Sequence, residues 1–129
     1  NVTFVTALSR GGWFDGVASL HAVRINGIDE LALTKLDVLN EMDEICVATG
    51  YELNGKRIHT VPTDTTQLTR VKPVYRSFPG WKQDLSGIRR FNDLPRRAQT
   101  YLEFLENYLK VRITLVSTGR ERGETIIRR

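Results

Sequence analysis

Apolar residues along this chain fall into short runs that polar turns separate, a pattern that predicts alternating strands and helices. Loose alternation or continuous apolar character predicts extended segments over residues 1–8, 31–33, 43–53, 56–61, 72–75, 111–116 and 124–128. Trp13-Phe14-Asp15-Gly16 leads into a segment whose apolar residues recur at helical spacing, which predicts a helix that runs to about Arg24. Phe14 and Ile25 are among its apolar positions. Asn26-Gly27 is expected to end it, since both residues tolerate left-handed φ.

The clearest helical pattern spans about Leu94 to Leu109, where one face carries Leu94, Ala98, Tyr101, Leu102, Leu105, Tyr108 and Leu109. Asp93 is expected to cap this helix, and Asp64 a short helix through Val71. Residues 81–91 show no pattern that predicts an element. Together these segments predict an α/β fold with a partial mixed sheet and helices packed on it.

Composition and length fit one globular unit over residues 1–129, with 40% hydrophobic and 26% charged residues. No apolar run approaches the roughly 18 residues that span a bilayer, so no membrane partner is expected. No secretory signal is visible at the start, and the single cysteine, Cys46, favours a reducing compartment, so we expect a cytoplasmic location. The two histidines and one cysteine form no metal-ligand cluster.

The formal net charge of +4 arises from 19 basic and 15 acidic residues. Such a mild excess suits an anionic small ligand as well as it suits nucleic acid. Because no basic stripe alternates with aromatic residues, nucleic acid is not expected as a partner.

A polar bend, Thr34-Lys35-Leu36-Asp37, follows the apolar run Leu31–Leu33, and Val38 and Leu39 after it are expected to start a helix. Ligands collect at such strand ends in open α/β sheets. An Asp there can accept two hydrogen bonds from guanine, at N1–H and the exocyclic amino group, which adenine cannot supply. The Lys35 stem can lie along the base while its ammonium stays solvated. An ordinary strand end with two solvated charges remains the alternative.

A second polar bend, Ser117-Thr118-Gly119, leaves the apolar strand 111–116 in the same way. If the two strands are neighbours, both bends meet at one edge of the sheet. A hydroxyl or backbone amides there can meet guanine O6 or the ring nitrogens while Asp37 takes the donor edge. A plain strand-end turn is the alternative.

Residues Gly50 to Lys56 nearly match the motif of a phosphate-binding loop, but we reject that interpretation. Arg57 stands where such a loop needs a Ser or Thr to hold magnesium. Asn54-Gly55 is instead typical of a two-residue hairpin between strands.

Several segments, in order and at near-constant spacing from about Gly12 to the end, closely resemble adenylosuccinate synthetase. They are Gly12-Trp13-Phe14-Asp15, Ala22-Val23-Arg24-Ile25-Asn26-Gly27, Leu33-Thr34-Lys35-Leu36-Asp37-Val38-Leu39, Pro73-Val74-Tyr75, Pro79-Gly80-Trp81, Asp93-Leu94-Pro95 with Ala98-Gln99, and Ser117-Thr118-Gly119. The likeness covers nearly all of this chain but only the C-terminal part of a family member.

The resemblance implies the C-terminal part of a larger P-loop-like nucleotide-binding fold, in an enzyme that condenses IMP with L-aspartate using GTP and Mg²⁺. It implies a 6-phosphoryl-IMP intermediate, from which aspartate displaces phosphate. By motif match, Lys35, Leu36 and Asp37 together with Ser117, Thr118 and Gly119 are the GTP-binding residues. It also implies a homo-oligomer, typically a homodimer.

Two departures from the family pattern limit what this chain is expected to do. The family's phosphate-binding loop, catalytic Asp and catalytic His lie upstream of the matched part, so catalysis by the chain alone is not expected and Mg²⁺ ligands are expected elsewhere. In the Arg-rich substrate loop, Ala7 and Ser9 replace two expected arginines and Arg10 alone remains. A non-catalytic guanine-nucleotide-binding or interaction module, and a diverged remnant without a nucleotide site, are the alternatives.

Overall fold

The structure, a computed structural model, describes residues 2–9, 12–62 and 64–128. Its helices are α1 (Gly16–Asn26), α2 (Thr65–Leu68) and α3 (Arg96–Leu109), with 3-10 turns η1 (Leu36–Leu39) and η2 (Phe91–Asp93). Its strands are β1 (Val2–Thr6), β2 (Leu8–Ser9), β3 (Gly12–Asp15), β4 (Glu30–Thr34), β5 (Glu44–Leu53), β6 (Lys56–Ile58), β7 (Lys72–Pro79), β8 (Arg112–Ser117) and β9 (Thr125–Ile127). Among the described residues, no helix is long and apolar enough to cross a membrane.

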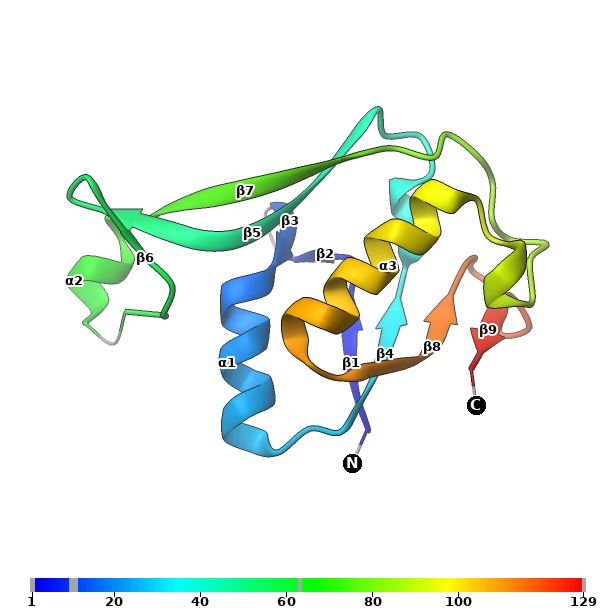
Figure 1. The fold of residues 1–129 in the computed structure, drawn as a ribbon, viewed down its shortest axis with the longest axis horizontal. Helices are drawn as coiled ribbons and strands as arrows, with labels where there is room; N and C mark the ends of the chain where they lie inside the picture. Colours follow the sequence, from blue (N-terminus) through cyan, green and yellow to red (C-terminus); the bar gives the residue numbers. More distant parts are fainter. Residues whose placement is uncertain (1, 10–11, 63, 129) are drawn as a thin grey trace.

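The first sheet carries the strand order β1-β4-β8-β9 and confirms the α/β prediction. β1, β4 and β8 are parallel, whereas β9 runs antiparallel to β8. The pairing of β4 with β8 places the residue after each strand at the same edge of the sheet (Figure 1). This edge is where the two predicted bends lie.

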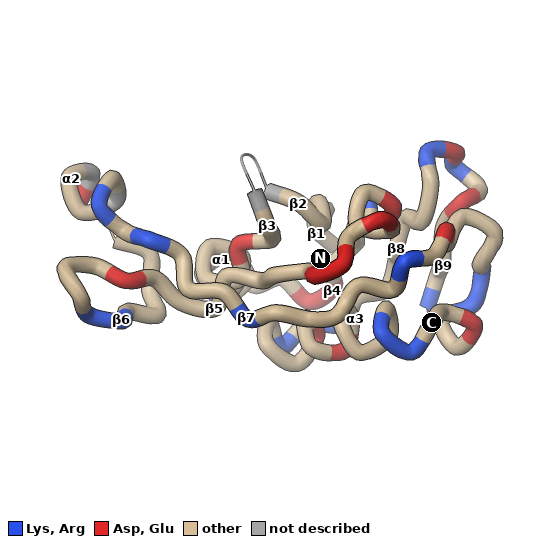
Figure 2. The backbone as a smooth tube through the Cα atoms, turned by 90° about the horizontal axis from the view of Figure 1, so that it is seen from above, with Lys and Arg blue, Asp and Glu red and all other residues tan. Residues whose placement is uncertain are grey.

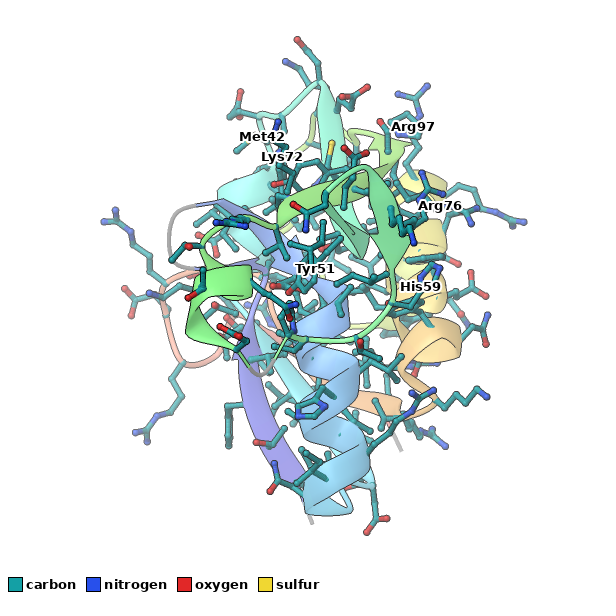
Figure 3. All side chains as sticks on the ribbon, turned by 90° about the vertical axis from the view of Figure 1, so that its left-hand side faces the viewer. Met42, Tyr51, His59, Lys72, Arg76 and Arg97 are labelled. Atoms are coloured by element: carbon teal, nitrogen blue, oxygen red, sulfur yellow. The ribbon has the colours of Figure 1, made fainter. Side chains whose placement is uncertain are left out.

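The second sheet joins β2, β3, β5 and β6 in that order, and β7 pairs with β5 along nearly its whole length. The β5–β7 pair extends away from the first sheet and carries β6 and α2 at its far end (Figure 1). Asn54 and Gly55 form the expected hairpin turn, with φ values of 52° and 81°, which confirms that Gly50–Arg57 is no phosphate-binding loop. Arg76 of β7 lies beside α3 (Figure 3), with its guanidinium carbon 4.7 Å from the Phe104 ring centroid.

The hydrophobic core lies between α3 and the two sheets. The buried residues of α3 are Ala98, Tyr101, Leu102, Leu105 and Leu109, all on the predicted face. They join β4, β8 and the loop residues Trp81 and Leu85 in one cluster. Because burying each large side chain contributes about 1.5–3 kcal/mol, this cluster fixes the strands that carry the site.

The N-terminus of α3 differs from the prediction, since Pro95 and not Asp93 is the residue that precedes the helix. Asp93 is the last residue of η2, and Leu94 between them is extended, with φ −65° and ψ 149°. A proline disfavours helical backbone at the residue before it, so the helix begins only after Pro95.

The first helix also begins later than predicted. Phe14 belongs to β3, where it pairs with Val47 of β5, and α1 begins only at Gly16. Asp15 caps α1, its Oδ1 accepting a hydrogen bond from the Ala18 amide at 3.0 Å. Gly27 ends it with φ 60°, as expected. Ile25 is 67% exposed rather than packed, because the last turn of α1 lies in solvent.

Candidate functional site

The bend after β4 is built on an unusual backbone conformation at Lys35, whose φ of 60° lies in the left-handed region. A non-glycine residue there costs about 1–3 kcal/mol and persists where its surroundings hold it. Leu36 and Leu39 hold it here, since both are fully buried. The helix expected from Val38 is the single turn η1, which leaves Asp37 half-buried at the surface.

The two predicted bends meet. The Lys35 amide donates a hydrogen bond to Ser117 Oγ at 3.3 Å, joining residues that lie 82 positions apart in the sequence. The bond follows from the β4–β8 pairing, which brings the ends of both strands together. The condition that the sequence left open, that the strands are neighbours, is therefore met.

The bend after β8 is closed by Glu124. The Thr118 amide and hydroxyl both donate to the Glu124 carbonyl oxygen, at 2.8 and 3.1 Å. The Glu124 carboxylate accepts a hydrogen bond from the Glu121 amide at 2.9 Å and lies against Gly119. Thr118 is fully buried, so its side chain stabilises the bend itself.

A surface hollow of about 470 Å³ opens between the two bends. Its lining residues are Asp37, Asn40, Glu41, Asp84, Ser86, Thr118, Gly119, Arg120, Glu121 and Glu124. Five of these residues carry carboxylates and one carries a guanidinium, so the lining is strongly acidic. Such a hollow favours a ligand that presents N–H donors and disfavours one that presents phosphates.

One wall of the hollow comes from the loop after β7, which the sequence pattern could not place. Trp81 anchors this loop, its indole donating to Asn40 Oδ1 at 2.9 Å beside η1. Lys82 adds a hydrogen bond to the Glu41 carbonyl and an ion pair with Asp43 at 3.0 Å. The Ser86 amide donates a hydrogen bond to Asp84 Oδ1 at 2.9 Å, and this bond lowers the pKa of that carboxyl group.

The residues proposed from the sequence thus have different surroundings. Asp37 and Gly119 line the hollow with Thr118, Ser117 joins the bends, Lys35 is exposed, and Leu36 is an apolar anchor with no exposed surface. Arg10 lies outside the described residues. Sequence reasoning missed Glu41, Asp84, Ser86 and Glu124, whose positions depend on tertiary contacts rather than on a local motif.

Metal binding finds no support in the part of the chain that the structure describes. Among residues 2–9, 12–62 and 64–128, no group of three or more His, Cys, Asp or Glu side chains is arranged to hold a metal ion.

Away from the hollow, the Tyr51 hydroxyl of β5 donates a 2.5 Å hydrogen bond to Asp15 Oδ2. Burial first, and then the bond to Asp15 and its charge, raise the pKa of Tyr51 well above its ordinary value. Because Asp15 also caps α1, the hydrogen bond between Tyr51 and Asp15 connects this helix to the second sheet (Figure 3).

Comparisons with known proteins point to one family. A family model described as "Adenylosuccinate synthetase" matches residues 5–126. The adenylosuccinate synthetase of Gloeothece citriformis is 52% identical over 118 residues, covering 92% of this chain and 26% of that protein. That of Salinibacter ruber is 50% identical over 117 residues, covering 91% and 27%.

A solved structure, described as fully ligated adenylosuccinate synthetase from Plasmodium falciparum, is similar with a TM-score of 0.86 and 34% identity. The match covers 92% of this chain and 29% of that chain. The present chain therefore spans about a quarter of the length of the curated relatives it matches.

Proposed function

This chain belongs to the adenylosuccinate synthetase family, and from that premise we propose that it supplies the guanine-recognition part of a ligase. The whole enzyme joins IMP and L-aspartate to form adenylosuccinate in purine biosynthesis, with GTP as the phosphoryl donor. One observation carries this proposal: the bends after β4 and β8 meet, through Lys35 and Ser117, beside a hollow that Asp37 lines.

The acidic lining supports a base pocket rather than a phosphate pocket. Guanine presents N1–H and an exocyclic amino group, and the Asp37 carboxylate can accept both hydrogen bonds. Adenine presents an acceptor at N1, which would face the same carboxylate without a proton between them. The hollow is therefore expected to bind guanine more tightly than adenine, because adenine leaves the Asp37 carboxylate without a hydrogen-bond donor.

The same electrostatics support a triphosphate site outside this hollow. Five carboxylates around the hollow repel a phosphate chain, so the phosphate contacts and the Mg²⁺ ligands belong to the part of a family member that this chain does not span. We propose that the residues described here take no part in the bond-making steps. GTP binding by the chain alone is then weak but selective for guanine.

Binding experiments test this proposal directly. GTP and ATP are titrated into the chain at high salt, which weakens binding through the phosphates elsewhere on the chain. Asp37→Ala is the site variant, and Asp93→Ala is a control that removes an exposed carboxylate outside the hollow. We expect at least tenfold preference for GTP, about 1.4 kcal/mol, lost in Asp37→Ala and kept in Asp93→Ala. Equal binding of both nucleotides by the unaltered chain would support a diverged remnant.

Catalysis by the chain alone is a separate question. Incubation with IMP, aspartate, GTP and Mg²⁺ is expected to yield no adenylosuccinate by chromatography, with an intact family enzyme as the positive control. Measurable turnover would contradict the assignment of the catalytic groups to the absent part. A non-catalytic guanine-binding or interaction module on the same scaffold is the second candidate.

Self-association is also proposed, because β1 exposes apolar side chains at one edge of the first sheet. β1 pairs with β4 on one side, and Phe4 and Val2 are 69% and 47% exposed. Exposed apolar strand edges favour association between chains. Light scattering is expected to detect dimers or larger species, whereas a monomer at high concentration would contradict this.

Location in the cytoplasm is proposed from the unpaired Cys46.

A further inference from the structure

A second hollow, of about 460 Å³, lies beside β9 and has the opposite charge to the first. Its lining includes Arg89, Arg90, Arg112 and Arg128, together with Phe91 and Ile127. The arginines come from three parts of the chain: the loop before η2, the start of β8 and the residue after β9. Lys and Arg positions gather near β9 in Figure 2.

Arg128 is held rigidly at this hollow. Its Nη1 donates to Glu106 Oε2 at 2.9 Å and to the Ile113 carbonyl at 3.2 Å, and its guanidinium carbon lies 4.1 Å from the Phe91 ring centroid. About a quarter of its side chain remains exposed. A group fixed in this way loses little conformational entropy when it binds a ligand.

Glu106 is the carboxylate paired with this group, and it is already engaged. The same Oε2 that contacts Arg128 accepts the Ile113 amide at 2.8 Å. Four guanidinium groups and no carboxylate are found among the described residues that line the hollow, so its lining is basic. A concave surface concentrates such a potential more than a flat one does.

Local hydrogen bonds also determine the side-chain conformation of Arg89. Its Nη1 donates to the carbonyl oxygens of Ser86 and Ile88, which bends the side chain back along its own loop. Arg90 and Arg112 are exposed residues of the same lining. The loop after β7 therefore contributes to both hollows: Asp84 and Ser86 line the acidic hollow, and Arg89 and Arg90 line the basic hollow.

We propose that the arginine-lined hollow binds a small phosphate-bearing anion with at least two negative charges, at a site distinct from the acidic hollow. Arginine suits this ligand because its planar fork donates two parallel hydrogen bonds to phosphate oxygens. The two hollows share no lining residue, and their opposite charges select different chemistry. This site goes beyond the base-recognition role and does not depend on it.

Calorimetric titration of the full chain with inorganic tripolyphosphate and orthophosphate at low salt tests the site. The site variant combines Arg90→Gln and Arg112→Gln, and the control combines Arg57→Gln and Arg70→Gln, which remove the same charge from exposed positions outside the hollow. We expect one saturable site, weakened at least tenfold in the site variant and less than twofold in the control.

Added salt should weaken this binding, and Asp37→Ala should leave it intact. Equal losses in the site and control variants, or no saturable binding, would overturn the proposal. Titration with ATP separates two sources of the phosphates. Affinity equal to that of tripolyphosphate supports recognition of the phosphates alone, and higher affinity supports a nucleotide. Matching urea denaturation curves for all variants exclude misfolding as the cause.

Discussion

Gly80 lies where β7 passes into the loop that forms one wall of the acidic hollow, and replacing it with alanine should strongly destabilise the chain. A Cβ built at this position would lie 1.8 Å from the Met42 carbonyl oxygen and 2.8 Å from its carbon. Real Cβ atoms essentially never approach closer than 3.0 Å, so the backbone must separate by about 1.2 Å. The clash is with backbone, which cannot rotate away as a side-chain end can.

The size of the effect follows from what that separation breaks. The Gly80 amide donates to the Asp43 carbonyl at 2.8 Å, and its own carbonyl accepts from Arg97 at 3.0 Å. Overpacking costs about 1–3 kcal/mol, and each lost hydrogen bond adds about 1 kcal/mol. We therefore expect Gly80→Ala to lower the free energy of unfolding by about 3–5 kcal/mol, a large share of the 5–15 kcal/mol typical of a domain.

Urea denaturation followed by circular dichroism measures this loss, with Gly87→Ala as the matched control. Gly87 lies in the same loop, and a Cβ there meets nothing within 4 Å. The control should change the free energy of unfolding by no more than about 0.5 kcal/mol. Similar denaturation midpoints for the two variants would refute the close approach of Gly80 to Met42.

Three further predictions follow from particular contacts. The Tyr101 hydroxyl is buried with no hydrogen-bond partner in the described part of the chain. Tyr101→Phe removes this unpaired group and should raise the free energy of unfolding, measured by urea denaturation, by about 1 kcal/mol. Burial raises the pKa of Tyr101, and burial with Asp15 raises that of Tyr51, so the folded state holds both phenolic protons more tightly. The contribution of these two tyrosines to stability should therefore be constant below about pH 10 and fall above it, because the unfolded state ionises first. Tyr51→Phe should reduce that slope in alkaline denaturation curves. Gly119→Ala would place a Cβ 2.6 Å from the Glu124 carboxyl carbon, a flexible side-chain end, so it should cost about 1 kcal/mol of stability while reducing GTP selectivity in titrations.

The parts of the site that the sequence could predict are those with a local pattern. Apolar runs marked β4 and β8, and a polar bend after each pointed to ligand chemistry. The neighbouring position of the two strands could not be read from either segment, because it depends on pairing between residues far apart in the chain. The hydrogen bond between Lys35 and Ser117 is the result of that pairing.

The loop after β7 shows why the remainder could not be predicted. Its position depends on the Trp81 indole bonded to Asn40 and on fully buried Leu85, neither of which produces a periodic signal. The Asp93 cap was wrong for a different reason, since Pro95 two residues later determines where α3 begins. Local rules failed where a neighbouring residue or a tertiary contact imposed a stronger constraint.

The ratio of GTP to ITP affinity tests the role of Asp37 most directly, because inosine lacks only the exocyclic amino group of guanine. One hydrogen bond to a half-buried carboxylate is worth about 1.5 kcal/mol, the lower end of its range, which is about tenfold in affinity. The unaltered chain should therefore bind GTP about ten times more tightly than ITP, and Asp37→Asn should reduce the ratio towards one. A ratio near one in the unaltered chain, or a preference for GTP that Asp37→Asn leaves intact, would contradict guanine recognition at this hollow.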